Sequence, residues 1–207
     1  LKMSADKGNI QGMNYYGVIL YKGDGIEENK EEALKYLKMS ADGGNSSAMY
    51  NYALMKHEYL KYSDDNDDWL KYLKMSVDKG NLNGINYYAE VLYYGNGIEE
   101  NKDEALKYYK MSADYGDPNA MCNYALINSE INPNNVQETV KYYNLAIDKN
   151  NTKAMCCYAL ALYKGEIIPA DKQKALLYYK MAADNGSLKG MFYYALMKYN
   201  GEGGLVD

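Results

Sequence analysis

Residues 9–44 read NIQGMNYYGVILYKGDGIEENKEEALKYLKMSADGG, and residues 81–116 repeat that stretch as NLNGINYYAEVLYYGNGIEENKDEALKYYKMSADYG. A fixed period of 36 residues is the signature of a stacked repeat protein, in which each repeat buries its apolar face against its neighbours. Alignment of the remaining chain gives five full repeats, numbered here in chain order: 9–44, 45–80, 81–116, 117–150 and 151–186. Partial repeats occupy 1–8 and 187–207, so residues 1–207 are expected to form a single array that is a portion of a longer chain.

Each repeat is expected to hold two helices. The first helix follows a short polar residue whose side chain can cap the first turn, namely Asn9, Asn45, Asn81, Asp117, Asn151 or Ser187. The second follows Asn29, Asp65, Asn101, Asn135 or Asp171, and a Glu three residues after Asn29, Asn101 and Asn135 resembles a capping box. The second helix ends at residues that tolerate a left-handed backbone: Gly44, Gly80, Gly116, Asn150 and Gly186.

The apolar residues keep helical spacing within each helix, which predicts where the helices pack. A small residue recurs in every first helix, at Gly17, Ala53, Ala89, Ala125, Ala159 and Ala195, where the two helices of a hairpin should approach closely. Two tyrosine positions also recur. One set is Tyr16, Tyr52, Tyr88, Tyr124, Tyr158 and Tyr194, and the other is Tyr36, Tyr72, Tyr108, Tyr142 and Tyr178. We interpret both as core positions with surface hydroxyls, in preference to a stacking platform for bases.

The order of these elements is similar to one known family. A small residue, an aromatic residue before Gly or Ala, Leu-Tyr, GxGI and EALKYYKMSADxG follow one another in repeats 1 and 3 and, with changes, in repeat 5. This order resembles the Sel-one-like repeat (SLR), a relative of the tetratricopeptide repeat. The resemblance implies an all-α protein, a right-handed α-solenoid of antiparallel helical hairpins that acts as a protein-interaction adaptor without shared catalytic residues. Repeats 2 and 4 depart from the pattern, and their loops are expected to span 56–69 and 128–135.

Composition disfavours several classes of partner. The net charge is −5 and every one of the 23 basic residues is Lys, which argues against nucleic acid, since Arg is the usual reader of phosphates and base edges. No apolar run is long enough to insert into a membrane. The three cysteines, Cys122, Cys156 and Cys157, are odd in number and irregularly placed, which favours free thiols in a reducing, cytoplasmic compartment. Cys122 and Cys156 share one repeat position and are therefore candidates for proximity.

The sequence offers no catalytic, cofactor-binding or metal-binding residues. His57 is the only histidine, so a histidine-based metal site or a Ser/His/Asp triad would lack its partners, and His57 is expected to be an ordinary surface-facing residue. The acidic run 64–68 fails as a calcium loop, because counting from Asp64 places Trp69 at position six and Met75 at position twelve.

The candidate site comes from the geometry of related solenoids, in which the first helices line the concave face. The resemblance then assigns to that face the first-helix residues not used for packing: Asn14, Val18, Tyr21, Tyr50, Leu54, His57, Asn86, Glu90, Tyr93, Cys122, Leu126, Ser129, Cys156, Leu160, Tyr163, Phe192, Leu196 and Tyr199. Their variation between repeats fits either a heterogeneous groove or the drift of unconstrained surface positions. Few are charged, which suits a peptide or a helix of a protein partner.

Two functions are therefore kept open. The first is a non-catalytic scaffold or adaptor that binds a protein segment on this face. The alternative is an auxiliary or regulatory region of a larger enzyme, for example a kinase or a subunit of a ligase complex, whose catalytic part lies outside these residues. An enzyme in its own right is disfavoured, and neither cofactor nor metal is expected.

Overall fold

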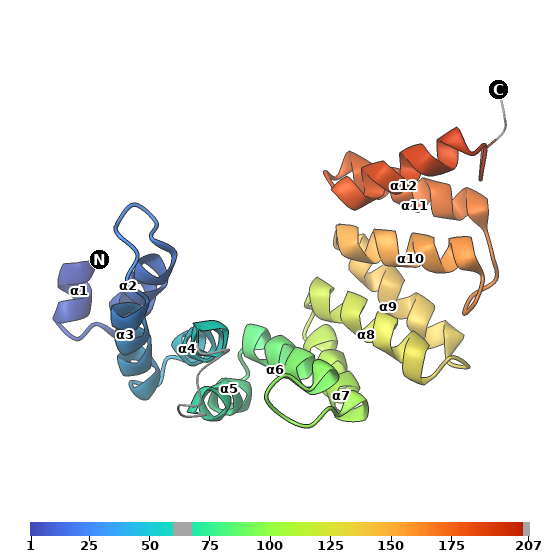
Figure 1. Cartoon of the computed structure of the whole chain (residues 1–207). Helices are drawn as coiled ribbons and strands as arrows, with labels where there is room; N and C mark the ends of the chain where they lie inside the picture. Colours follow the sequence, from blue (N-terminus) through green and yellow to red (C-terminus); the bar gives the residue numbers. More distant parts are fainter. Residues whose placement is uncertain (60–67, 205–207) are drawn as a thin grey trace. The chain divides into compact units, whose positions relative to one another are not determined.

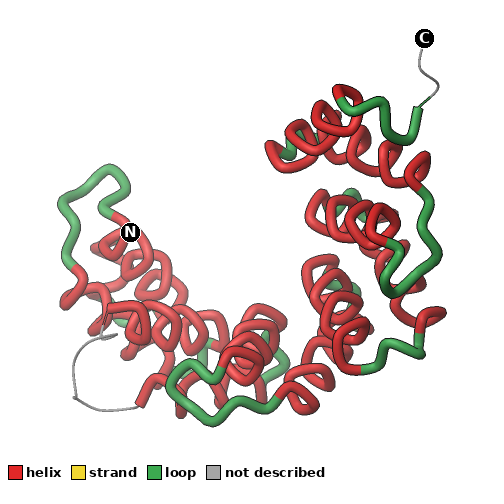
Figure 2. The backbone as a smooth tube through the Cα atoms, turned by 45° about the vertical axis from the view of Figure 1, so that its right-hand side comes forward, coloured by secondary structure: helices red, strands yellow, loops and turns green. Residues whose placement is uncertain are grey.

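The computed structural model describes residues 1–59 and 68–204, which form twelve α-helices joined by loops (Figures 1 and 2). The predicted all-α fold is confirmed, because helix follows helix in sequential hairpins. The chain divides into two compact units, Leu1–Val91 and Leu92–Asp207, called here the N-terminal and C-terminal units. Each unit is described by itself.

The N-terminal unit consists of short helices that pack in chain order. They are α1 (Lys2–Asp6), α2 (Ile10–Lys22), α3 (Lys30–Asp42), α4 (Ser46–Tyr59), α5 (Asp68–Asp78) and most of α6 (Leu82–Tyr94). Repeat 1 is the hairpin α2/α3 and repeat 2 the hairpin α4/α5, while α3 contacts α4. Helix α2 also contacts α4, so the first helices of these two repeats are neighbours.

The C-terminal unit continues the same scheme. Its further helices are α7 (Lys102–Asp114), α8 (Pro118–Ile131), α9 (Val136–Asp148), α10 (Thr152–Lys164), α11 (Lys172–Asp184) and α12 (Leu188–Tyr199). Repeat 4 is the hairpin α8/α9 and repeat 5 the hairpin α10/α11, which lie one above the other in Figure 1. Contacts of α10 with both α8 and α12 bring the first helices of repeats 4, 5 and 6 side by side.

The predicted first-helix caps are all confirmed. In each case the backbone N–H three residues further on donates to the side-chain oxygen of the cap, over distances of 2.7–3.1 Å, as in Asn9, Asn45, Asn81, Asp117, Asn151 and Ser187. These bonds satisfy N–H groups that have no partner inside the helix.

The second-helix caps are confirmed with one exception. Asn29, Asn101 and Asp171 accept the bond from the third residue of their helices. Asn135 is the N-cap residue of α9, as predicted, but its side-chain oxygen accepts no cap bond; its amide nitrogen donates to Glu138 over 2.6 Å. The predicted cap Asp65 lies outside the described residues.

The residues that end the second helices adopt the left-handed backbone that was predicted. Gly44, Gly80, Gly116 and Gly186 have φ between 71° and 93°. Asn150 has φ 58° and is, within 1–59 and 68–204, the only non-glycine residue with positive φ. Asparagine is one of the few residues that tolerate this conformation.

Two predicted loops are shorter than expected. Residues 56–59 belong to α4, and residues 128–131 belong to α8. In α8 the helix continues because the buried Asn128 donates to Thr139 over 3.0 Å and its carbonyl accepts from the backbone of Asn132, the C-cap, over 2.8 Å. These bonds favour one more helical turn over an earlier start of the loop.

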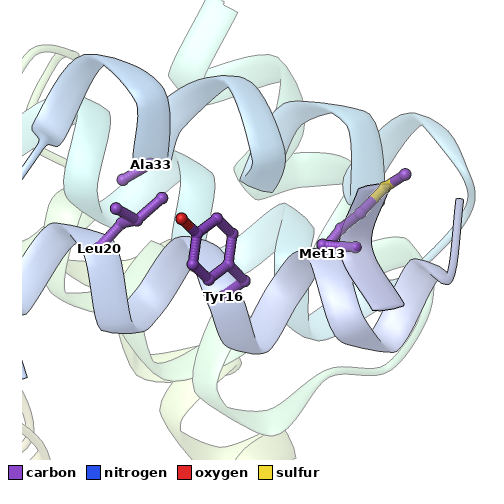
Figure 3. Packing of buried hydrophobic residues seen from close by; sticks show 5 residues of the cluster. Met13, Tyr16, Leu20 and Ala33 are labelled. Carbon is purple, nitrogen blue, oxygen red and sulfur yellow. The ribbon is translucent and has the colours of Figure 1, made fainter. Parts of the chain in front are cut away.

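The interior of each hairpin is built on the predicted apolar positions. In repeat 1, Met13, Tyr16, Leu20 and Ala33 are buried together (Figure 3). A Cβ on Gly17 would lie 2.7 Å from Cγ of Leu37, so the two helices approach closely at this small residue, as predicted. Larger side chains at this position would force the two helices apart.

The two tyrosine sets pack against each other, as predicted for core positions. Tyr52 meets Tyr72 edge-on with ring centroids 4.8 Å apart, and Tyr124 meets Tyr142 at 4.4 Å. Three hydroxyls of the second set reach the preceding repeat, where they donate to aspartates: Tyr36–Asp6, Tyr72–Asp42 and Tyr142–Asp114. These three rings therefore join two repeats as well as two helices.

Candidate partner-binding surface

The first-helix residues predicted to face a partner differ in exposure. The buried ones are Asn14, Cys122, Ser129 and Cys156. Those of intermediate exposure are Val18, Tyr21, Tyr50, Leu54, His57, Asn86, Tyr93, Leu160 and Tyr163. The exposed ones are Glu90, Leu126, Phe192, Leu196 and Tyr199. The exposed and intermediate residues are called the first-helix surface below.

The buried residues are covered because successive first helices pack with an offset of one residue. Asn14 accepts from Asn51 of the next repeat over 3.0 Å. At the same pair of positions, Tyr50 meets Tyr87 edge-on with centroids 6.1 Å apart. A residue at the first predicted position therefore faces the neighbouring repeat, so burial leaves Asn14 little surface for a partner.

The cysteines follow the same offset. The nearest thiol to Cys122 is that of Cys157, the neighbour of Cys156 in the chain. Interaction with Cys157 and burial raise the pKa of the Cys122 thiol. The Cys156 sulfur instead lies 3.6 Å from the hydroxyl of Ser187. All three cysteines are free.

An aromatic residue at the third predicted position bridges repeats 1, 2, 3 and 5 to the repeat that follows. The Tyr21 hydroxyl donates to the carbonyl of Met55 over 3.3 Å. His57 stacks on Trp69 at 4.1 Å between ring centroids, and its Nδ1 lies 2.7 Å from the Tyr87 hydroxyl. His57 thus bridges two repeats while it remains partly exposed, so it does more than the ordinary surface-facing residue that was expected.

In two repeats the bridge includes a carboxylate and a lysine. Tyr93 donates to Glu130 over 2.6 Å, and Lys102 donates to the same carboxylate over 2.7 Å. These bonds hold the pKa of Glu130 below its ordinary value. Tyr163, Glu202 and Lys172 repeat the arrangement, with the hydroxyl 2.9 Å and the ammonium 2.6 Å from the carboxylate. In both cases the ammonium also lies over the tyrosine ring, 5.1–5.2 Å from its centroid.

Repeat 4 has Ser129 where repeats 1, 2, 3, 5 and 6 carry Tyr or His. Beside Ser129 the C-terminal unit contains a pocket of about 190 Å³. Its walls are Leu126 and Ser129 of α8, Thr139 and Tyr143 of α9, Cys157, Leu160, Ala161 and Lys164 of α10, and residues 166–168 of the following loop. Most of these side chains are apolar. The sequence alone shows that repeat 4 lacks an aromatic residue at this position. It does not show whether other side chains fill the space, and only an unfilled space is a pocket.

Within the described residues, neither a metal centre nor a membrane span is found. Across 1–59 and 68–204, no group of three or more His, Cys, Asp or Glu side chains is arranged to hold a metal ion. No helix in the described part of the chain is both long enough and apolar enough to cross a lipid bilayer. The acidic residues 64–67, considered above for calcium, lie outside the described residues.

The stacked hairpins, their caps and the recurring small residues define a helical-repeat protein of the SLR type. The sequence model of the Sel1 repeat matches residues 10–45, 83–117, 118–151, 154–187 and 188–207. These matches cover well over half of the chain, which belongs to the Sel1 repeat family. Residues 46–82, which hold most of repeat 2, lie outside the matches, in keeping with the departure of that repeat from the pattern.

Solved structures share the fold over most of the chain. A protective antigen present in uropathogenic Escherichia coli strains, described as displaying an SLR fold, superposes with a TM-score of 0.85 at 24% identity over 100% of this chain. The chain spans 44% of that antigen's length. A Sel1 repeat protein from Oxalobacter formigenes gives 0.79 at 26% identity, over 92% of this chain and 78% of the other.

More distant structures have the same fold. An immunity protein from Pseudomonas aeruginosa superposes with a TM-score of 0.59 at 19% identity, over 89% of this chain and 68% of its own. No curated protein shows significant sequence similarity to the chain.

Proposed function

We propose that this Sel1 repeat protein is a non-catalytic scaffold that binds a peptide or helix of a partner protein on its first-helix surface. The observation that carries the proposal is an apolar strip in the C-terminal unit. Leu126, Leu160 and Leu196 occupy one position in α8, α10 and α12, which are neighbours in space. Leu126 and Leu196 are 43% and 40% exposed.

The strip is apolar along its length. Leu160 of α10, its middle residue, is partly exposed. Contiguous exposed apolar side chains mark sites of protein interaction, since water contact with them is unfavourable. Consecutive helices that present apolar anchors in this way suit an amphipathic helix or an extended segment.

Other features favour a protein partner. The negative net charge and the absence of Arg oppose binding to nucleic acid. Two structures of the same fold are called an immunity protein and a protective antigen, names that refer to neither a reaction nor a cofactor. The odd number and irregular placement of the cysteines favour a reducing compartment, and we extend the proposal to a cytoplasmic location and a single continuous array.

Site-specific crosslinking tests the proposal. A photo-crosslinking amino acid is placed at Leu126, Leu160 or Leu196, and as controls at the exposed Leu145 of α9 and Leu177 of α11. One protein should crosslink from the first three positions and from neither control. Once that partner protein is purified, the triple substitution of Leu126, Leu160 and Leu196 by Glu should lower the affinity of the repeat protein for it at least about 100-fold while helicity is unchanged. The reason is that burying each new carboxylate against an apolar partner costs desolvation free energy.

Two results would overturn this function. One is equal crosslinking from Leu145 and Leu177. The other is unchanged affinity of the triple variant, with the Leu145→Glu, Leu177→Glu double variant as its matched control.

A further inference from the structure

The pocket beside Ser129 occupies the place of an aromatic side chain that repeat 4 lacks. Ser129 is the thirteenth residue of its repeat, and the residues at that place elsewhere are Tyr21, His57, Tyr93, Tyr163 and Tyr199. Ser129 is too short to bridge to repeat 5. Its hydroxyl turns back and donates to the carbonyl of Leu126 in its own helix, over 2.6 Å.

The contacts of the aromatic residues in other repeats show where the missing ring would lie. Tyr21 reaches Met55, whose counterpart in repeat 5 is Ala161. His57 reaches Tyr87, whose counterpart is Cys157. Both counterparts line the pocket, and both are smaller than the residues they replace.

The polar contacts point to the same place. Tyr93 donates to Glu130 and Tyr163 donates to Glu202. Their counterparts in repeat 5 are Lys164 and Glu166, and both again line the pocket. All four of these counterparts, Ala161, Cys157, Lys164 and Glu166, therefore form part of its wall.

The pocket has room for a ring. Its volume of about 190 Å³ exceeds the roughly 150 Å³ of an engineered apolar cavity in another protein that binds benzene. Leu126, Leu160 and Ile167 supply apolar walls, and Ile167 stands where repeats 1 and 3 have the second loop glycine.

We propose that this pocket receives the side chain of a tyrosine from the partner protein, in place of the aromatic residue that repeat 4 lacks. The ring lies between α8, α9 and α10, and the phenol hydroxyl donates to the Glu166 carboxylate as Tyr163 does to Glu202. Lys164 already lies 3.7 Å from Glu166, so the carboxylate keeps a cation beside it, as Glu202 does with Lys172. The inference rests on the proposed function, since Leu126 and Leu160 belong to the first-helix surface.

Glu166 distinguishes tyrosine from other apolar side chains. A hydrogen bond to an ionised carboxylate is stronger than one between neutral groups. A phenol can donate this bond to Glu166, whereas a plain benzene ring cannot, so the phenol should bind more tightly. The preference is therefore tested with p-cresol, which is the tyrosine side chain with a hydrogen in place of Cα, and with toluene, which is that of phenylalanine.

The experiment is a titration of the whole chain, labelled at Leu and Ile methyl groups, followed by NMR. We expect p-cresol to shift the methyl signals of Leu126, Leu160, Ile167 and Ile168, and to bind about 10-fold more tightly than toluene. Glu166→Gln should lower p-cresol affinity about fivefold and leave toluene affinity unchanged. Ser129→Tyr, which supplies the ring from the chain itself, should abolish binding of both.

Tyr163→Ser provides a gain-of-function control that does not depend on Ser129. It removes the ring next to Glu202 and Lys172, so it should create a second p-cresol site in repeat 5. If Ser129→Tyr fails to fold, this variant and the wild-type comparison of p-cresol with toluene still decide the question.

Several outcomes overturn the inference. They are no methyl shifts with p-cresol up to its solubility limit, equal affinity for toluene, or undiminished p-cresol binding in a folded Ser129→Tyr protein. A dimer in sedimentation velocity that p-cresol dissociates would make a second copy of this chain the occupant. Failure of p-cresol to bind while the Leu-to-Glu triple variant still loses its partner would reject this pocket and leave the proposed function standing. If p-cresol binds but the Leu-to-Glu triple variant keeps its affinity for the partner, the proposed function is rejected.

Discussion

Tyr142 donates a hydrogen bond of 2.6 Å to Asp114, the last residue of the preceding second helix. The bond joins repeat 4 to repeat 3 across their second helices. Tyr72 and Asp42 make the same bond two repeats earlier, between repeats 2 and 1, and Tyr36 makes it with Asp6 of the preceding partial repeat. In a repeat protein, stability depends on such interfaces between neighbours as well as on the repeats themselves.

Replacement of Tyr142 by Phe should therefore destabilise the protein by about 1 kcal/mol, the usual net worth of a hydrogen bond. The loss is modest because Asp114 is exposed and regains water when the hydroxyl is removed. Urea denaturation followed by circular dichroism measures the change. Tyr115→Phe, at a ring that is 71% exposed, is the control and should change stability little. Equal effects of the two substitutions would contradict a stabilising role for the Tyr142 bond.

The same bond predicts a dependence on alkaline pH. Burial and the bond to Asp114 raise the pKa of Tyr142 above the ordinary value of about 10. A group whose pKa is higher in the folded state stabilises the protein fully below its unfolded pKa, and this contribution is lost as pH rises through the folded value. The difference in unfolding free energy between wild type and Tyr142→Phe should be constant from pH 7 to 9 and shrink above pH 10. A difference that grows above pH 10 would show the opposite sign of coupling.

Two of the three second-helix caps of the C-terminal unit provide a matched pair. Asn101 and Asn135 both donate from their amide nitrogen to a glutamate, Glu104 and Glu138 respectively. Only Asn101 also accepts a backbone N–H, over 3.0 Å. Asn101→Ala should therefore cost about 1 kcal/mol more than Asn135→Ala. Thermal unfolding of both variants checks this, and equal losses would mean that the cap bond of Asn101 contributes nothing measurable.

Asn150 adopts a left-handed backbone that other side chains resist. Its φ is 58°, and glycine occupies the equivalent place in the other repeats. Asn150→Ala should destabilise the protein by about 1 kcal/mol, because a Cβ without local hydrogen bonding is strained there. Asn150→Gly, the control, should change stability by less than about 0.5 kcal/mol, since asparagine is tolerated almost as well. A larger loss with Gly than with Ala in denaturant titrations would refute the conformational explanation.

Much of the fold follows from local patterns in the sequence. The bond from the Gly12 N–H to Asn9 and the left-handed Gly44 depend on groups a few residues apart, so a single repeat predicts them. Asn135 shows where this reasoning fails. Its amide nitrogen donates to Glu138, as that of Asn101 does to Glu104, yet its oxygen accepts no backbone N–H.

The candidate surface was harder to predict than the helices. Asn14 and Cys156 were expected to face a partner, yet both are covered by the next repeat. His57 was expected to be an ordinary surface residue, yet it stacks on Trp69. In each case the deciding contact comes from another helix, and the helical period alone does not show which residue of that helix will lie opposite.

The sequence by itself determined the period, the helices, the caps and the small residues at the hairpin contacts, because each depends on spacing within one repeat or on its recurrence. Only the tertiary structure decided which first-helix side chains reach solvent and that the absence of a ring at Ser129 leaves a pocket. The reason is that exposure depends on the one-residue offset between neighbouring first helices. A pocket remains only where the side chains of both repeats are too short to fill the space between them.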